Sequence, residues 1–476
     1  MIFSSLEFLF LFLPINIIAY FAIPSKHLKW RNLVLLATSL IFYAWGEPIY
    51  VFIMVFSIMC DYILGYFVSK HIEKDDKKTA KRYVIASVIV NLCILGFFKY
   101  SDFFIENLRL IPALSSLKPL GISLPIGISF YTFQTMSYTI DLYRRDAKVQ
   151  KNIFSFGMYV TLFPQLIAGP IVRYKDIDEQ VRKRDESIAL FASGIRTFMA
   201  GFAKKILLAN VAGEMWNTFS SMPAAERTTF GSWLGIICYA FQIYFDFSGY
   251  SDMAIGLGKM FGFKFLENFN YPYISKSITE FWRRWHMSLS TWFREYVYFP
   301  LGGSRCSPLR NTINLLIVWF LTGFWHGASW NFIIWGLYYF VLLMIERAFL
   351  LKYLERIPAF FKHLYTLVFV LFGWLIFVFD TFETAGAGMT YLGNMFGSGV
   401  VEFASQENLY DFIRNLPFFI ILGIAATPLP KKLFYRFYEK SPIIKLGAYL
   451  CGTATFIIGV AYLVDSSYNP FLYFRF

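Results

Sequence analysis

Residues 49–69 read IYVFIMVFSIMCDYILGYFVS, an apolar run that stops at the first lysine of a basic cluster. A helix needs about 20 apolar residues to cross a bilayer, so this run is long enough to span one. Similar runs recur along the chain, at residues 1–23, 32–46, 83–100, 120–141, 154–172, 188–212, 230–255, 312–324, 326–350, 364–380, 412–428 and 446–464. The pattern predicts an all-α, multi-pass membrane protein with about 10–12 membrane segments, some kinked or re-entrant at Pro and Gly.

Composition supports this interpretation and excludes other classes. Of the 476 residues, 57% are hydrophobic and only 16% are charged, whereas soluble domains carry about 25% charged residues. No stretch resembles a separate polar domain, so we expect one membrane-embedded domain over residues 1–476. The net charge of +13 lies in short runs between apolar segments, which is typical of cytoplasmic loops and not of nucleic-acid binding. The five cysteines show no metal-site spacing, so we expect no metal.

The basic clusters predict an orientation in the membrane. Clusters at residues 26–31 and 70–82 are both expected on the cytoplasmic side. The chain between them then crosses twice, with a turn at residues 46–48, which places the N-terminus outside. Residues 1–23 lack a basic start and a cleavage pattern, so we interpret them as an uncleaved first span. A later cluster at residues 431–445 is also cytoplasmic by this rule, so one more span carries the tail, residues 465–476, to the outer face.

Two histidines lie in or beside apolar segments and are candidates for catalysis. His326 lies in FWHGASW (residues 324–330) and His286 in FWRRWHMSLS (residues 281–290). Imidazole has an ordinary pKa near 6.5, so it can accept and donate protons near neutrality. Two structural alternatives remain open: His326 as a helix-end residue among interfacial tryptophans, and His286 on a membrane-surface helix with the basic neighbours Arg283 and Arg284.

Two aspartates interrupt another apolar segment. Asp246 and Asp252 lie in DFSGYSD (residues 246–252). Charged groups in such a segment either line a polar channel or pair with an arginine. The sequence leaves both alternatives open.

Several of these stretches together resemble a known family. SLPIGISFYTFQ (residues 123–134), PQLIAGPIVR (164–173), DFSGYSD and both histidine motifs are similar to the membrane-bound O-acyltransferase (MBOAT) superfamily, and within it to the bacterial alginate O-acetylase and peptidoglycan O-acetyltransferase group. The resemblance implies a helical ring around a thinned centre with a through-tunnel. It also implies that His326 is catalytic and that His286 occupies a second active-site position, where it orients the acyl donor or stabilises the oxyanion.

The resemblance further implies acetyl-CoA as a cytoplasmic acyl donor, with no permanently bound cofactor. The charges of Arg283 and Arg284 suit its phosphates, although no family motif assigns them this role.

The last residues, NPFLYFRF (469–476), end in an F-x-Y-x-x-F pattern. This ending resembles the C-terminal acyl-relay motif of bacterial acylation systems and marks Tyr473 as a relay nucleophile. A phenol, with a pKa near 10, is easier to deprotonate than an alkyl hydroxyl, so a neighbouring histidine can activate it. The alternative is that the tail is an aromatic anchor at the membrane interface.

These features predict a membrane O-acetyltransferase of a bacterial cytoplasmic membrane. The acetyl group is expected to pass through Tyr473 to an extracytoplasmic SGNH or esterase-like transferase, with a polysaccharide as final acceptor and lipid around the chain. A transporter of acyl groups or lipid-linked sugars, without covalent chemistry, is the alternative, because intramembrane charges also mark transport pathways. A structural scaffold would leave the histidines unexplained.

Overall fold

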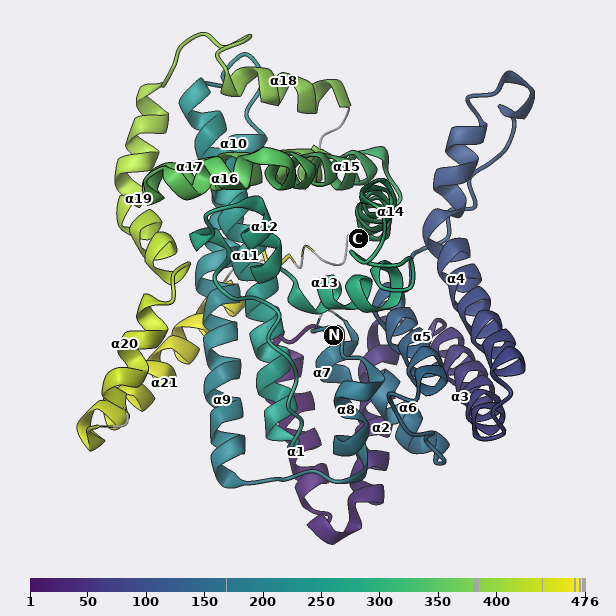
Figure 1. The fold of residues 1–476 in the computed structure, drawn as a ribbon. Helices are drawn as coiled ribbons and strands as arrows, with labels where there is room; N and C mark the ends of the chain where they lie inside the picture. The colour runs from purple at the N-terminus through teal and green to yellow at the C-terminus, as the bar shows by residue number, and fades with distance from the viewer. Residues whose placement is uncertain (168, 380–384, 439, 466–467, 471, 473–476) are drawn as a thin grey trace. The chain divides into compact units, whose positions relative to one another are not determined.

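The computed structural model describes residues 1–167, 169–379, 385–438, 440–465, 468–470 and 472, and all regular structure among them is helical (Figure 1). The expected all-α membrane fold is confirmed. The chain forms two compact units: unit 1 is Met1–Phe198 with Tyr250–Leu266, and unit 2 is Met199–Gly249 with Glu267–Phe476. The ring with its tunnel and the single-domain assignment stay predictions.

Among the described residues, twelve helices begin in unit 1, and the last of them, α9, ends in unit 2. In chain order they are η1 (Phe8–Phe12), α1 (Leu13–Phe21), η2 (Ser25–His27), α2 (Leu28–Gly46), α3 (Val51–Glu73), α4 (Lys77–Leu108), η3 (Pro112–Leu114), α5 (Ile128–Arg144), α6 (Ile153–Thr161), α7 (Phe163–Leu166), α8 (Tyr174–Arg182) and α9 (Ile188–Ala203). The expected turn at residues 46–48 is confirmed, because α2 ends at Gly46 and α3 begins at Val51.

The remaining helices begin in unit 2, and α11 has residues in both units. They are η4 (Lys204–Asn210), α10 (Val211–Ser220), α11 (Thr229–Met260), η5 (Pro272–Ile274), α12 (Ile278–Arg284), α13 (Met287–Phe293), η6 (Arg294–Tyr298), α14 (Pro308–His326), α15 (Trp330–Ile345), η7 (Glu346–Leu350), α16 (Leu351–Arg356), α17 (Ala359–Val378), α18 (Ala385–Met395), α19 (Gln406–Ala425), α20 (Leu429–Tyr438) and α21 (Pro442–Asp465).

Fewer helices than expected are suited to cross a membrane. Among the described residues five qualify by length and hydropathy, or up to seven if two bent pairs are each one span. One bent pair is Phe8–Phe21 with Ser25–Gly46, at 104°, and the assignment of residues 1–23 as a first span stays a prediction. The difference from 10–12 segments arises because several apolar stretches form short or broken helices. Residues 154–172, for example, contain α6, α7 and loop.

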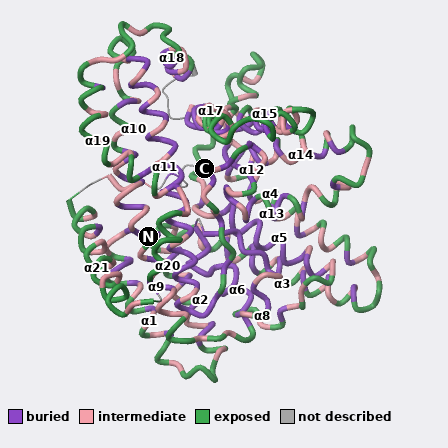
Figure 2. Tube along the Cα trace, turned by 60° about the vertical axis from the view of Figure 1, so that its left-hand side comes forward, coloured by how far each residue is buried: buried purple, intermediate pink, exposed green. Residues whose placement is uncertain are grey.

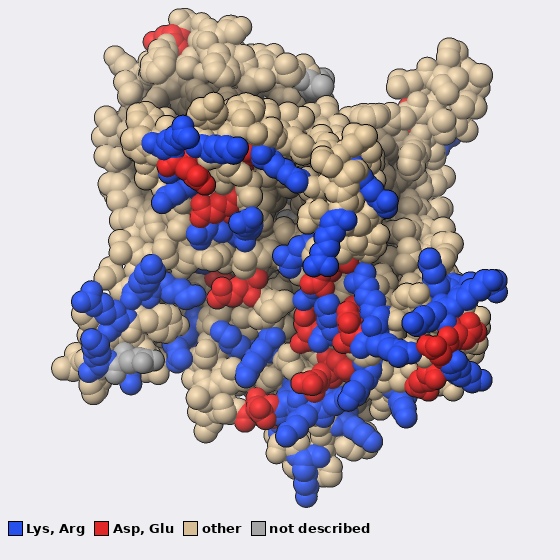
Figure 3. Space-filling model, in the orientation of Figure 1, with Lys and Arg blue, Asp and Glu red and all other residues tan. Residues whose placement is uncertain are grey.

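The surface is apolar in the way that a lipid environment requires. Phe52 of α3 is 73% exposed and Ile188 of α9 is 89% exposed. Figure 2 shows exposed residues along α19 and α21 and buried residues along α5 and α6. Figure 3 shows broad areas of surface without Lys, Arg, Asp or Glu. Large apolar side chains that are exposed in this way are suited to contact lipid.

Unit 1 contains a buried polar network that joins three helices. Asp61 of α3 accepts hydrogen bonds from Ser87 Oγ (2.5 Å) and Asn91 Nδ2 (2.7 Å) of α4. Thr135 of α5 donates to Asn91 Oδ1 (3.0 Å), and Thr139 Oγ1 lies 2.9 Å from Ser87 Oγ. A carboxylate between apolar helices is expensive unless it is hydrogen-bonded. The network therefore fixes how α3, α4 and α5 pack.

Candidate active site

His326 is the last residue of α14, and close packing determines where that helix ends. Gly327 leaves the helix in an extended conformation. A Cβ atom on Gly327 would lie 2.2 Å from the ring of Phe332, so only glycine allows this ring to cover the turn. Ser329 then precedes the first residue of α15. The W-H-G sequence is thus a tight connection that holds His326 between two apolar helices.

Two further glycines bring α14 and α15 into contact. A Cβ atom on Gly323 of α14 would lie 2.3 Å from the carbonyl oxygen of Phe332, and one on Gly336 of α15 would lie 2.4 Å from that of Trp319. Small residues at such crossings let helix backbones approach closely in a membrane. The close approach sets the position of the His326 ring.

Aromatic rings surround His326, which is 4% exposed. The centroids of Trp335, Trp325 and Phe377 lie 4.9, 5.0 and 5.4 Å from the imidazole centroid, each in an edge-to-face arrangement. This packing leaves the imidazole few rotameric alternatives and keeps bulk water away from it.

His286 occupies the turn between α12 and α13 in an unusual backbone conformation. Its φ of 44° and ψ of 54° are left-handed, and such a conformation costs a non-glycine residue about 1–3 kcal/mol. The side chain is 1% exposed. Trp282 and Trp285 of the same motif are buried, whereas Arg283 between them is exposed. Residues three apart share a helix face, which explains the W-R-R-W order before the histidine.

Asn268 determines which nitrogen of His286 carries the proton, and sequence reasoning missed it. The Asn268 side-chain oxygen accepts from the backbone N–H of Ser288 (3.2 Å) and from Ser288 Oγ (2.9 Å), which identifies it as an acceptor. His286 Nδ1 lies 3.1 Å from the same oxygen and must therefore donate to it. In the neutral imidazole, Nε2 then has a lone pair and accepts hydrogen bonds. An asparagine in the polar stretch ENFN (residues 267–270) gives no local signal of this role.

The two histidines border the same indole ring. The Trp325 centroid lies 5.0 Å from that of His326 and 6.2 Å from that of His286. Forty residues of chain separate these positions, and the structure brings both into one aromatic cluster of unit 2. No group of three or more His, Cys, Asp or Glu among the described residues is arranged to hold a metal ion.

Arg283 and Arg284 differ in what they contact. Arg284 donates to Glu280 Oε1 from Nε (3.0 Å) and from Nη2 (2.8 Å), and to the carbonyl oxygen of Asn270 (3.1 Å). These contacts tie α12 to the loop that carries Asn268. Arg283 is exposed and forms no ion pair with a carboxylate among the described residues. Arg283 is therefore better suited than Arg284 to contact an anionic substrate.

Glu346 supports the helix that precedes His286, and it too was missed. Its carboxylate is 0% exposed and accepts from the backbone N–H groups of Ile278 (2.6 Å) and Thr279 (2.8 Å), the first two residues of α12. Tyr365 also donates to it, at 3.1 Å. A carboxylate at a helix N-terminus satisfies unpaired N–H groups and interacts favourably with the helix dipole. The sequence signal that could have identified this role is a single glutamate within the apolar segment 326–350.

The predicted relay residue Tyr473 lies outside the described residues. Leu472, which precedes it, is described, and its backbone N–H donates to Asp246 Oδ2 at 3.0 Å. Asp246 also pairs with Lys205, at 2.7 Å. Its partner is thus a lysine, where the sequence suggested an arginine or a polar channel.

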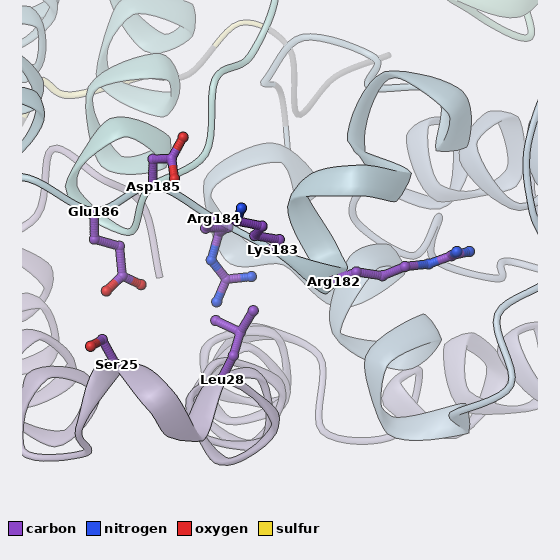
Figure 4. A pocket seen from close by; sticks show the side chains of 7 residues that line it. All are labelled: Ser25, Leu28, Arg182, Lys183, Arg184, Asp185 and Glu186. Carbon is purple, nitrogen blue, oxygen red and sulfur yellow. The ribbon is translucent and has the colours of Figure 1, made fainter.

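Unit 1 has a cavity of about 460 Å³ (Figure 4), and neither His286 nor His326 lines it. Its lining is Ser25, Leu28, Arg182, Lys183, Arg184, Asp185 and Glu186. Most of the charged groups in this lining make contacts that stabilise the fold. Arg182 pairs with Asp178 (2.7 Å), and Glu186 pairs with Arg31. Arg184 donates to Asn32 Oδ1 (2.8 Å). We assign this cavity no role in the chemistry.

Comparison with known proteins identifies the family to which the chain is similar. A family model described as MBOAT, membrane-bound O-acyltransferase family, matches residues 135–405. The probable alginate O-acetylase AlgI of Azotobacter vinelandii is 42% identical, covering 81% of this chain and 76% of that protein. The protein of the same name from Pseudomonas putida is 38% identical over 100% of both chains. The peptidoglycan O-acetyltransferase of Helicobacter pylori is 35% identical, covering 81% of this chain and 78% of that protein.

Fold and matches together define a membrane-embedded acyltransferase. The chain belongs to the membrane-bound O-acyltransferase family, and it is an O-acyltransferase.

Proposed function

We propose that this protein takes an acetyl group from cytoplasmic acetyl-CoA and passes it across a bacterial cytoplasmic membrane for O-acetylation of an extracytoplasmic polysaccharide. Membership of the family and the names of the relatives, which act on alginate and peptidoglycan, support this proposal. The observation that carries it is the pair of buried histidines around Trp325.

In the proposed reaction His326 acts as general base. It takes the phenolic proton of Tyr473, and the phenolate oxygen attacks the thioester carbonyl of acetyl-CoA. The carbon–sulfur bond breaks, an acetyl ester forms on Tyr473, and the imidazolium returns its proton to the leaving CoA thiolate. General-base catalysis of this kind contributes about 10²–10⁴-fold in rate.

His286 orients the acyl donor in this scheme. Its Nδ1–H is donated to Asn268, so Nε2 accepts a hydrogen bond from an N–H group such as an amide of the pantetheine arm. This tautomer favours orientation of the donor over stabilisation of the oxyanion, which requires a hydrogen-bond donor. Arg283 is the residue that we propose to contact the CoA phosphates, because Arg284 is engaged with Glu280.

The aryl ester on Tyr473 then serves as donor for the next transfer. We propose that the serine of an SGNH or esterase-like partner attacks it on the outer face, which restores the phenol. The partner finally transfers the acetyl group to a polysaccharide hydroxyl. An aryl ester suits this role because phenolate is a better leaving group than an alkoxide.

The first test is intact mass spectrometry of the purified protein after incubation with acetyl-CoA. We expect the wild type to gain one acetyl group, Tyr473→Phe to gain none, and His326→Ala to gain it at least about 100-fold more slowly. His27→Ala is the matched control, because His27 is exposed at the start of α2, and it should behave as wild type. A passive transporter would acquire no covalent label. Wild-type labelling in the His326→Ala variant would contradict the role of His326 as base.

A further inference from the structure

A buried ion pair in unit 2 contacts the C-terminal segment of the chain. Lys205 Nζ of η4 lies 2.7 Å from Asp246 Oδ1 of α11, and their side chains are 1% and 3% exposed. Removing both charges from water is expensive, and a single pair contact seldom repays that penalty. Additional hydrogen bonds to each member are needed, and the C-terminal segment supplies them.

The local backbone explains how the pair forms. Gly249 lies one turn after Asp246, and a Cβ atom there would lie 2.7 Å from the carbonyl oxygen of Gly201. This close approach brings α11 against the start of η4. η4 is a π-helix, in which residues five apart share a face. Lys205 and Asn210 are five apart, and Lys205 Nζ donates to Asn210 Oδ1 at 2.9 Å.

The C-terminal segment binds to these side chains mainly through its backbone. Lys205 Nζ donates to the carbonyl oxygen of Pro470, and the N–H of Leu472 donates to Asp246 Oδ2 at 3.0 Å. Asn210 Nδ2 lies 3.3 Å from both the carbonyl oxygen of Tyr468 and the Asn469 side-chain oxygen, to which it donates.

A fourth side chain contacts the same segment. Gln242 Nε2 of α11 lies 3.1 Å from the Tyr468 hydroxyl oxygen and donates to it. Gly213 of α10 leaves room for this contact, because a Cβ atom there would lie 2.5 Å from Gln242 Nε2 and 2.8 Å from the tyrosine oxygen.

These contacts pair each charge with a backbone group of the tail that suits it. Lys205 donates to the carbonyl oxygen of Pro470, and Asp246 accepts from the N–H of Leu472, so the ion pair matches the order in which the backbone presents these two groups. Charge-assisted hydrogen bonds in a buried site are stronger than neutral ones, so this match favours one register of the segment.

We propose that Lys205, Asn210, Gln242 and Asp246 form a docking site, the tail clamp, that positions the C-terminal segment for acyl transfer. The clamp fixes the backbone at Leu472, one residue before Tyr473. Phe247 follows Asp246 on α11, and its ring centroid lies 4.7 Å from that of His286. Adjacent residues of one helix thus hold the tail and contact the active-site histidine. This inference rests on the proposed function for its purpose, but the docking itself is measurable without any reaction.

The test is hydrogen–deuterium exchange of the full-length protein in detergent, without acetyl-CoA, read on the C-terminal peptide from residue 466 onward. Leu472→Pro removes the N–H that Asp246 accepts, whereas Leu472→Ala removes only the side chain and serves as matched control. We expect the remaining tail amides to exchange about ten-fold faster or more in the proline variant, as loss of a hydrogen bond to a charged group implies. Because the Leu472 side chain is buried, its loss speeds exchange in both variants, so the ten-fold difference is measured between the proline and the alanine variant.

Reversing the two charges distinguishes a docking role of the Lys205–Asp246 pair from a purely structural role. Lys205→Asp combined with Asp246→Lys keeps the ion pair but presents each tail group with the wrong charge, so we expect fast tail exchange in a folded protein. Slow exchange in both this variant and Leu472→Pro would overturn the inference. If the reversed protein does not fold, Leu472→Pro decides alone. A protected tail whose Tyr473 gains no acetyl group would contradict the relay while leaving the clamp intact.

Discussion

At the scale of single residues, His286 combines backbone strain with desolvation. It lies between α12 and α13, outside the helices long enough to span a membrane. Burial lowers the pKa of its imidazole from about 6.5 to about 3, so His286 is neutral at pH 7. A neutral ring with its proton on Nδ1 is the form that Asn268 selects. The catalytic role suggested by the sequence rested on the ordinary imidazole pKa near 6.5. Burial gives His286 a much lower pKa, of about 3.

This lowered pKa predicts a stability that depends on pH. Between pH 6.5 and pH 3 the unfolded chain binds a proton on His286 that the folded protein does not, so stability is complete above pH 6.5 and falls as pH falls. From pH 6.5 to pH 5 we expect a loss of about 1.5 kcal/mol from this group. His286→Asn should lack this loss, and asparagine tolerates the left-handed backbone. Thermal unfolding of both proteins at the two pH values measures the difference. Equal losses in both would contradict the prediction.

At the scale of elements, short helices and not long spans hold the candidate site. α12 has two turns, too few to be stable alone, so its ends depend on tertiary contacts. Ser277 Oγ accepts from the N–H of Glu280 at 3.0 Å, and Glu346 accepts from the first two residues. Because His286 follows the last turn of α12, its placement depends on a carboxylate from another helix.

Replacing Glu346 should therefore affect stability and activity together. Glu346→Ala leaves buried N–H groups without an acceptor, and we expect a loss of about 3 kcal/mol in unfolding free energy. Glu346→Gln keeps one carbonyl acceptor, so its loss should be about half as large. Glu355→Ala, at an exposed site on α16, is the control and should change little. Thermal unfolding with the acetylation assay checks this. An unchanged Glu346→Ala protein would show that α12 does not need this cap.

At the scale of the whole molecule, the distribution of basic residues predicts which ends face outward. The cluster at residues 70–82 begins before α4, and the cluster at 431–445 precedes the last apolar helix, α21. Lys and Arg hold such loops in the cytoplasm. This rule predicts that the tail after α21 is extracytoplasmic, on the side where the proposed polysaccharide-modifying partner would meet it.

Fusions to the intact C-terminus test this orientation. Alkaline phosphatase needs disulfides that form only outside the cytoplasm, so we expect the phosphatase fusion to be active and a green fluorescent protein fusion to be dark. A tag inserted after Asp76 should be accessible only in inside-out vesicles. A fluorescent C-terminal fusion would contradict the orientation and would place Tyr473 on the same side as acetyl-CoA.

The sequence alone was sufficient for the membrane class, the helical fold and the family, whereas the roles of the two histidines stay predictions. These follow from properties that add up along the chain: the length of apolar runs, the position of basic clusters and short motifs. The turn between α2 and α3 was also predictable, because Gly46 and Pro48 act locally on the backbone. The number of membrane segments stays a prediction, because only five to seven described helices are long and apolar enough to cross a bilayer and an apolar run does not reveal whether lipid or protein covers it.

Only the tertiary structure decided which polar groups meet. Asn268 and His286 are separated by 18 residues, Glu346 and Ile278 by 68, and Asp246 and Leu472 by 226. Hydrophobic periodicity shows which residues are buried, but it carries no information on which buried donor faces which acceptor. That choice depends on the close approach of backbones at Gly249, Gly323 and Gly336. The physical reason is that a hydrogen bond requires its two atoms to lie within about 3 Å, and only the packed chain determines that distance.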